Sequence, residues 1–190
     1  MNKKIYTLTT LLSLLLILFT SCGDSSDDGI DYEWKARNER IFDEAASTYT
    51  NILNSESKDG FIRFNRVSES NSNLKMAQDG TIQFSDSVTV RYEGWYINAD
   101  GEKYIFDSTE NNNKVPVTFG VKSVIDGWAT MLQNMKEGEE VEMCIPYKLA
   151  YGSSGQTNST STSYTIPPYT TLFFYMKVTK VIPCNPEEFN

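Results

Sequence analysis

Val124-Ile125-Asp126-Gly127-Trp128 is the stretch that decides the fold of this chain. Its Asp-Gly pair lets the backbone turn sharply, because Gly adopts positive φ angles at little cost. The residues that follow, 129–135, predict a short helix with its apolar side chains on one face, ended by Gly138. Trp128 is then either a core aromatic or the floor of a pocket.

Two aromatic segments flank this stretch in sequence, and we expect them to close over it. The upstream one is Tyr104-Ile105-Phe106-Asp107, and the downstream one runs from Tyr151-Gly152 to Ile166-Pro167-Pro168. Between the downstream motifs, residues 153–163 are all Ser, Thr, Asn, Gly or Gln, which leaves little to bury. We therefore expect 153–163 to form a mobile loop beside the cleft.

Most other segments read as β-strands, because apolar and β-branched residues alternate with polar ones. Few helices lie between the strands, so we predict an α+β fold in which a curled antiparallel sheet wraps over one short helix. This domain is expected to span 60–182, followed by a tail at 183–190. The expected strands are 61–67, 87–96, 103–106, 140–146 and 171–182.

Residues 30–54 predict an amphipathic helix in front of this domain, within a helical extension that spans 30–59. Apolar side chains recur at helical spacing at Ile41, Ala45, Tyr49 and Ile52. The apolar face needs something to pack on, which is either the body of the domain or a second copy of the chain. The chain is accordingly expected to be a monomer, or a dimer formed through this helix.

The composition excludes several classes of function. Lys and Arg total 17 against 25 Asp and Glu, which gives a net charge of −8. An acidic chain of this kind argues against nucleic acid as the main partner. The chain has no histidine, which excludes His-based catalytic triads and His-ligated metal sites. We expect neither a metal nor a cofactor.

Residues 1–21 predict an export signal. Lys3 and Lys4 form a basic start, and 11–19 is an apolar run too short to span a bilayer stably. Phe19-Thr20-Ser21-Cys22 is similar to a bacterial lipobox, in which Cys22 becomes the lipidated first residue of the mature chain. A plain signal peptide cleaved near Ser21 is the alternative.

The segment after Cys22 indicates where the chain is anchored. Residues 22–29 are polar and acidic and predict a flexible tether. This run resembles the one that follows the lipidated cysteine in surface-exported lipoproteins of the Bacteroides group. We therefore expect a lipid-anchored protein of the cell envelope, in the outer membrane, on its periplasmic or surface face.

Cys144 and Cys184 leave two possibilities open. An exported protein can pair them as a disulfide. Cys144 lies in an alternating segment, Glu142-Met143-Cys144-Ile145, and can equally be a small core residue. The sequence alone does not bring their Cα atoms within bonding range.

An ordered set of motifs resembles the FKBP-type peptidyl-prolyl cis-trans isomerases, especially the bacterial exported branch related to macrophage infectivity potentiators. The resemblance covers about residues 60–182, and its specificity lies in the order of the motifs. The motifs are Val88-Thr89-Val90-Arg91-Tyr92-Glu93-Gly94, Phe106-Asp107-Ser108-Thr109, Pro116-Val117-Thr118-Phe119, Val124-Ile125-Asp126-Gly127-Trp128, Met135-Lys136-Glu137-Gly138-Glu139, Leu149-Ala150-Tyr151-Gly152 and Ile166-Pro167-Pro168, with Thr171-Leu172-Phe173-Phe174.

The resemblance implies a five-stranded antiparallel sheet curled around a short helix, with an apolar pocket between them. It also assigns the pocket residues by motif. The catalytic residues it implies are Tyr92, Phe106, Asp107, Trp128, Tyr151 and Phe174. The substrate-binding residues it implies are Val117, Val124, Ile125 and Ile166, with Val117 where the family often has an aromatic residue.

Each implied role follows from the residue type. Trp128 would be the floor for a proline ring, and Tyr151 and the Ile125 N–H would donate hydrogen bonds to substrate carbonyls. Asp107 would orient Tyr92 or face the twisting carbonyl. Lys114 is the nearest basic residue that could pair with Asp107.

The implied activity is isomerisation of X–Pro bonds, which have a rotational barrier of about 18–20 kcal/mol. An apolar pocket favours the twisted, less dipolar amide over the planar one. The expected partners are proline-containing peptides, unfolded exported proteins and macrolides such as rapamycin. The alternative is a non-catalytic FKBP-like binding lipoprotein, and a third possibility is a surface lipoprotein that captures glycans.

Overall fold

The computed structural model describes residues 29–68, 81–110, 113–157 and 164–184. The expected signal peptide, the lipidation site Cys22, nearly all of the tether and part of the polar loop, at 158–163, lie outside the described residues. No helix among the described residues combines the length and apolar character needed to cross a bilayer.

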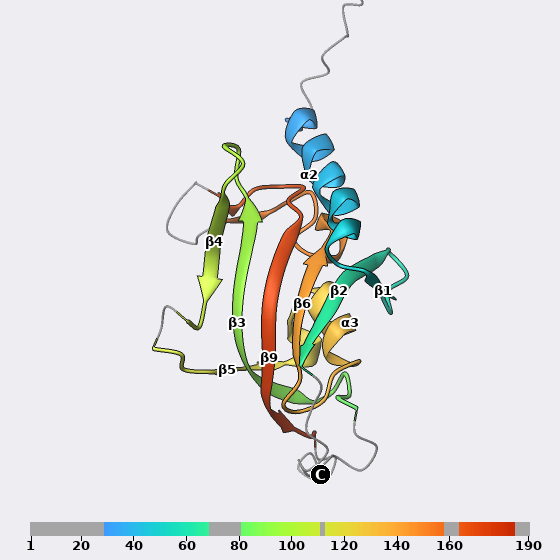
Figure 1. Ribbon diagram of the computed structural model, residues 1–190, viewed down its shortest axis with the longest axis vertical. Helices are drawn as coiled ribbons and strands as arrows, with labels where there is room; N and C mark the ends of the chain where they lie inside the picture. Colours follow the sequence, from blue (N-terminus) through green and yellow to red (C-terminus); the bar gives the residue numbers. More distant parts are fainter. Residues whose placement is uncertain (1–28, 69–80, 111–112, 158–163, 185–190) are drawn as a thin grey trace, which may run out of the picture. The chain divides into compact units, whose positions relative to one another are not determined.

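The domain is built on a seven-stranded sheet in the order β1-β2-β6-β9-β3-β4, with β5 paired to β3 (Figure 1). Every pairing is antiparallel. The strands are β1 (Asn51–Asn54), β2 (Phe61–Ser68), β3 (Ser87–Ile97), β4 (Lys103–Ser108), β5 (Val117–Gly120), β6 (Glu140–Ile145) and β9 (Leu172–Ile182). A separate hairpin joins β7 (Gln156–Thr157) to β8 (Tyr164–Ile166).

All five expected strands are present, as β2, β3, β4, β6 and β9, but the expected number of strands is too small. The sheet gains β1 and β5, each of which is four residues long. Strands this short carry too few alternating positions to be distinguished from turns or helix ends by sequence pattern.

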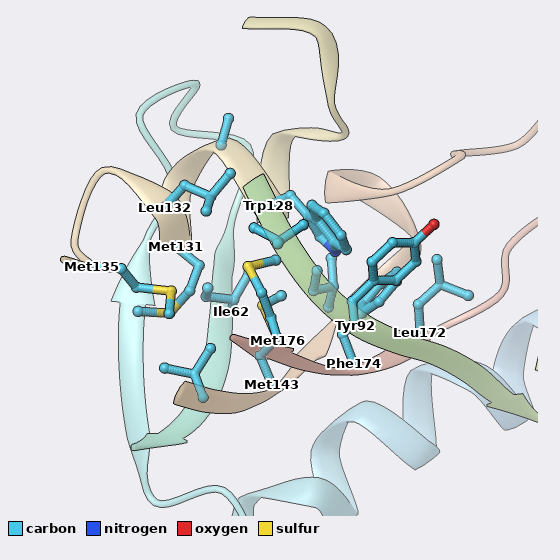
Figure 2. Packing of buried hydrophobic residues seen from close by; sticks show 14 of the residues in the cluster. Ile62, Tyr92, Trp128, Met131, Leu132, Met135, Met143, Leu172, Phe174 and Met176 are labelled. Carbon is cyan, nitrogen blue, oxygen red and sulfur yellow. The ribbon is translucent and has the colours of Figure 1, made fainter. Parts of the chain in front are cut away.

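The helix α3 (Asp126–Leu132) packs on one face of this sheet, and it begins and ends three residues earlier than expected. The Asp126 carboxylate is favourable in the first turn because of the helix dipole, and it accepts a hydrogen bond from Ser57 Oγ. Every residue from Gly127 to Leu132 is buried. Figure 2 shows the core beneath α3, with Met131 and Met135 at one end and Trp128 and Tyr92 at the other.

Strand β3 shows how the sheet faces α3. Its buried and half-buried positions alternate along its whole length, as the period of a strand requires. Val88, Val90 and Tyr92 join the core under α3, and the neighbouring strand β9 adds Phe174 and Met176 to the same core.

The N-terminal helix α2 (Tyr32–Glu44) is shorter than predicted. Its N-cap is Asp31, whose carboxylate accepts from the Trp34 N–H, and a 3-10 turn η1 (Ala45–Ser47) follows it. The expected helix over 30–54 is wrong beyond residue 47, because 51–54 hydrogen-bond to β2 as strand β1. Ile52, expected on the apolar helix face, is 58% exposed.

The other face of the sheet is covered by α2 and η1. Phe42, Ala45 and Tyr49 form a second apolar cluster with Cys144 and Phe173, which point away from α3. The body of the domain is therefore the partner of the helix's apolar face.

The two cysteines of the described part, Cys144 and Cys184, are both free thiols, the first buried and the second exposed. The possible disulfide between them is not formed. Burial raises the pKa of the Cys144 thiol, so that it behaves as a small core side chain.

Candidate functional site

A pocket of about 230 Å³ opens between α3 and the strands β3, β4, β5 and β9. We call it the aromatic pocket. It contains all of the predicted site residues except Val117 and Ile166. Its lining residues are Tyr92, Phe106, Asp107, Phe119, Ser123, Val124, Ile125, Trp128, Tyr151 and Phe174.

Trp128 lies at the base of this pocket and is only 4% exposed. Three rings meet it edge-on, with centroids 5.1 Å away for Tyr92, 5.2 Å for Phe174 and 5.8 Å for Phe119. Figure 2 shows Trp128, Tyr92 and Phe174 side by side at the end of the core. Such edge-to-face contacts fix the orientation of the floor.

Two glycines make these close contacts possible. A Cβ at Gly127 would lie 2.5 Å from Ile145 Cγ2, so α3 can approach β6 only without a side chain there. A Cβ at Gly94 would lie 2.6 Å from Phe174 Cε1 and 2.7 Å from Phe106 Cζ. Gly94 therefore lets the two wall rings, whose centroids are 5.7 Å apart, come together.

A β-bulge brings two consecutive residues of β4 to the pocket. The pairing of β3 with β4 shifts between Gly94 and Trp95, so that Asp107 lies opposite Gly94 and Ile105 opposite Trp95. Phe106 is the extra residue. In a regular strand Phe106 and Asp107 would point to opposite faces, and a bulge of this kind redirects side chains next to a site.

Asp107 accepts a hydrogen bond from Tyr92. This contact fits one of the two roles expected for Asp107, which is to orient Tyr92. Tyr92 Oη donates to Asp107 Oδ2 at 2.5 Å. Burial, and then this hydrogen bond, raise the pKa of Tyr92, so its hydroxyl stays protonated. The expected pairing of Lys114 with Asp107 is wrong, because Lys114 lies 3.8 Å from Glu110, and Glu110 also binds Arg91.

Two hydrogen-bond donors at the pocket are uncommitted. Neither the hydroxyl of Tyr151 nor the backbone N–H of Ile125 has an acceptor within the described ranges. Burial, and then the charge of Asp107, raise the pKa of Tyr151, which keeps this hydroxyl a donor. The indole Nε1 of Trp128 is also buried without a partner in the described part of the chain. Buried donors of this kind are rare and are typical of functional sites.

Two predicted residues lie elsewhere. Val117 is 37% exposed on β5, and Ile166 is completely buried in the core. The aromatic wall comes instead from Phe119, two residues after Val117, which sequence reasoning missed. A strand period of two offered the signal, because 117 and 119 share one face. No sequence signal marks Ser123.

The enlarged loop after Tyr151 is closed at its base. Tyr169 N donates to Gly152 O at 2.8 Å, and β7 pairs with β8 inside the loop. The prediction of a mobile loop over 153–163 is wrong at 156–157, which are in β7.

Helix α2 anchors the segment between this loop and β9. Trp34 Nε1 donates to Pro168 O at 3.0 Å and to Thr170 Oγ1 at 3.2 Å. Asn38 Oδ1 accepts from the Thr171 N–H at 2.9 Å, and Thr171 Oγ1 donates back to Asn38 O. Both Asn38 and Thr171 are buried. The N-terminal helix thus holds the chain three residues before the wall residue Phe174.

The described residues include no cluster of potential metal ligands. No three Asp, Glu, Cys or His side chains gather there closely enough to hold a metal ion. The pocket is instead lined by rings and aliphatic side chains, with a single carboxylate at Asp107.

Comparison with known proteins identifies this architecture. Residues 78–179 match the family model of FKBP-type peptidyl-prolyl cis-trans isomerases. A peptidyl-prolyl cis-trans isomerase Mip of Coxiella burnetii is 42% identical over 82 residues, 43% of this chain and 34% of the relative. The chain therefore spans about a third of the length of that relative.

Two further proteins match over more of their length. A macrophage infectivity potentiator of Trypanosoma cruzi is 30% identical over 190 residues, with 95% of this chain and 87% of the relative covered. A crystal structure of a peptidyl-prolyl cis-trans isomerase of Pseudomonas syringae superposes with a TM-score of 0.58 at 26% identity, covering 80% of this chain and 96% of that one. The chain therefore belongs to the family of FKBP-type peptidyl-prolyl cis-trans isomerases.

Proposed function

We propose that this chain catalyses cis–trans isomerisation of X–Pro bonds in polypeptides, with the aromatic pocket as the active site. The observation that carries the proposal is the enclosed Trp128 floor, bounded by Tyr92, Phe119 and Phe174, with uncommitted donors close by. The pocket is apolar where a proline ring would enter and polar where peptide carbonyls would remain.

The geometry lowers the barrier through binding alone. Rotation about the amide bond needs no nucleophile and no proton transfer, because only amide resonance must be broken. The twisted amide is less dipolar than the planar one, so it is transferred more easily from water into the aromatic pocket. The rings that fix Trp128 keep this surface in place before the substrate binds.

Polar groups at the pocket would hold the peptide around the proline. The Tyr151 hydroxyl and the Ile125 N–H would each donate to a substrate carbonyl, since both are free of other acceptors in the described part of the chain. Asp107 is engaged by Tyr92, which supports an orienting role for the carboxylate.

The expected substrates are proline-containing peptides and unfolded exported proteins, and macrolides such as rapamycin are expected to compete for the pocket. The test is isomerisation of tetrapeptides that vary in the residue before proline, with and without rapamycin. Catalysis that rapamycin abolishes supports the proposal. Binding of peptide and rapamycin without any rate enhancement would support the non-catalytic binding lipoprotein instead.

We also propose that the protein is lipidated at Cys22 and acts on exported proteins at the outer membrane. Support comes from the basic start, the short apolar run and the lipobox-like Phe19-Thr20-Ser21-Cys22. Cys22→Ser should leave the precursor uncleaved by lipoprotein signal peptidase and prevent attachment of a processed form. A correctly processed Cys22→Ser protein in the membrane fraction would refute lipidation, and wild-type protein serves as the control.

A further inference from the structure

A second cavity, larger than the aromatic pocket, lies where α2 meets the sheet. Its volume is about 360 Å³, within the range of about 300–1,000 Å³ found for ligand sites. It shares no lining residue with the aromatic pocket. We call it the α2 groove, and we define it by Glu39, Phe42, Asp43, Asp59, Phe61 and Tyr147.

The floor of the α2 groove is apolar. Phe42 and Phe61 pack with ring centroids 5.4 Å apart. Arg63, which does not line the groove, lies over both rings, at 5.1 and 5.2 Å, and donates to Phe42 O. Tyr147, from the 3-10 turn η3 (Tyr147–Leu149), forms another side. The floor therefore offers aromatic surface to an apolar side chain.

The rim of the α2 groove is acidic. Glu39 and Asp43 lie one turn apart on α2, and Asp59 comes from the turn between β1 and β2. Tyr147 Oη donates to Glu39 Oε1 at 3.2 Å. Within the described ranges, no hydrogen-bond donor or cation partners the carboxylates of Asp43 and Asp59, and Lys148 is the one cation of the lining.

This arrangement works against the stability of α2. Like charges at i and i+4 repel each other on a helix. A carboxylate in the last turn, as at Asp43, also opposes the helix dipole, and that turn carries no basic residue. Sequences usually break local rules of this kind at functional sites. A ligand of opposite charge would make the acidic rim favourable.

Charge complementarity favours a cationic ligand, because three carboxylates line the groove against the single cation Lys148. Asp24, Asp27 and Asp28 make the chain's own tether acidic, and a second copy carries the same net charge of −8. No set of three potential ligand side chains in the described residues is close enough for a metal ion. We propose that the α2 groove binds a cationic polypeptide segment in which a lysine or arginine neighbours an apolar side chain.

The α2 groove would recognise a different feature of a polypeptide from the one that the aromatic pocket would recognise. The pocket would accept a proline ring, whereas the α2 groove pairs carboxylates with a basic side chain and offers Phe42 and Phe61 to its apolar neighbour. An unfolded chain with both features could be held by the groove while its proline is processed. Binding in the groove does not depend on isomerase activity.

Calorimetric titration tests the proposal with a proline-free heptapeptide of alternating lysine and leucine. We expect binding that weakens as salt is raised. The double variant Asp43→Asn with Asp59→Asn should raise the Kd at least about tenfold. The matched control, Asp100→Asn with Glu102→Gln, removes the same charge at the exposed β3–β4 turn and should leave the Kd within about twofold.

Several outcomes would overturn the proposal. These are an unchanged Kd for the groove variant, an equal loss in the control, or equal binding of a peptide with glutamine in place of lysine.

Amide chemical shifts locate the bound peptide. They should move at Gly60 and Thr171, whereas movement confined to Ile125 and Tyr151 would assign the peptide to the aromatic pocket. A dimer that the groove variant dissociates would make the groove a self-interface. Tetrapeptide isomerisation should be equal in both variants, which separates this test from that of the proposed activity.

Discussion

The aromatic pocket and the α2 groove lie on opposite faces of one sheet, and they are built in different ways. The pocket is formed by side chains that also complete the core, such as Trp128 and Phe174. The groove is formed where an added helix meets the sheet, and its rim residues Asp43 and Asp59 are exposed. A substitution in the pocket is therefore expected to disturb the packing of the core, whereas a substitution at the groove rim is expected to change mainly the surface charge.

This difference shows how one small domain can carry two kinds of recognition. Changes in the pocket affect packing, because its rings contact one another at 5.1–5.8 Å. Changes at the groove rim leave the core intact. Each site can thus be altered while the other reports on the integrity of the fold.

The largest effect is expected from removing the pocket floor. Trp128→Leu keeps an apolar core side chain but loses the flat surface, so tetrapeptide kcat/KM should fall by more than about tenfold. Binding of the basic heptapeptide should remain. Trp95→Leu is the matched control, since Trp95 stacks on Phe173 in the other apolar cluster, and it should keep the isomerase rate. A wild-type rate for Trp128→Leu would remove Trp128 from the mechanism.

A smaller effect is expected from crowding the pocket walls. Gly94→Ala forces Phe106 and Phe174 apart, because the new Cβ would lie within 2.7 Å of both rings. Overpacking of this kind costs about 1–3 kcal/mol of unfolding free energy, and KM for peptides should rise. Thermal unfolding and steady-state kinetics measure the two effects. Gly120→Ala, where the nearest side-chain atom is 3.3 Å away, is the control and should change neither by as much.

The pocket was largely predictable from sequence because the ordered motifs that resemble the family assign most of its lining residues. The motif with Tyr92 lies in β3 and the motif with Trp128 lies at the start of α3. The sharp turn expected at Asp126-Gly127 is wrong, because both residues belong to the first turn of α3 and Gly127 has no positive φ. Non-local features were not predictable. The bulge at Phe106 depends on pairing with β3, and the choice of Phe119 over Val117 depends on where β5 docks.

The α2 groove gave no sequence signal, because its parts are distant along the chain. Its carboxylates at 39, 43 and 59 read as an ordinary solvated face until the fold brings them to one cavity. Strand β1 was misread for a similar reason. Ile52 and Leu53 fit helical spacing, and only hydrogen bonds to β2 decide that they are extended.

One residue connects the two sites and should affect both. Asn38→Ala leaves the buried Thr171 N–H without its acceptor, which should cost about 1–3 kcal/mol of unfolding free energy. Thr171 lines the α2 groove and Phe174 lines the aromatic pocket, so both peptide affinity and KM should worsen. Arg40→Ala breaks only an exposed 3.8 Å pair with Glu44 and is the control. An effect of Asn38→Ala on stability alone would mean that the sites are independent.

The smallest effect is expected from a carboxylate that is already partnered. Glu140 lies on β6, and its Oε1 is 2.5 Å from Lys177 Nζ while its Oε2 accepts from Tyr175 Oη at 2.9 Å. The Lys177 bond, with that from Tyr175, lowers the pKa of Glu140 below its ordinary 4.5. A lowered carboxyl pKa contributes stability that is present above pH 4.5 and is lost as the pH falls through the folded-state value.

Glu140→Gln should therefore lower the unfolding free energy at pH 7 by about 0.2–1 kcal/mol. It should also remove part of the loss of stability seen as the pH falls below 4.5.

Asp43→Asn is the contrasting variant, because it removes a charge that faces Glu39 and has no cation partner among the described residues. It should leave stability unchanged or raise it slightly. Chemical denaturation at pH 3 to 7 measures both. Equal losses for the two variants would mean that the groove carboxylates are stabilised within the fold, and their proposed role in binding a cation would lose its physical basis.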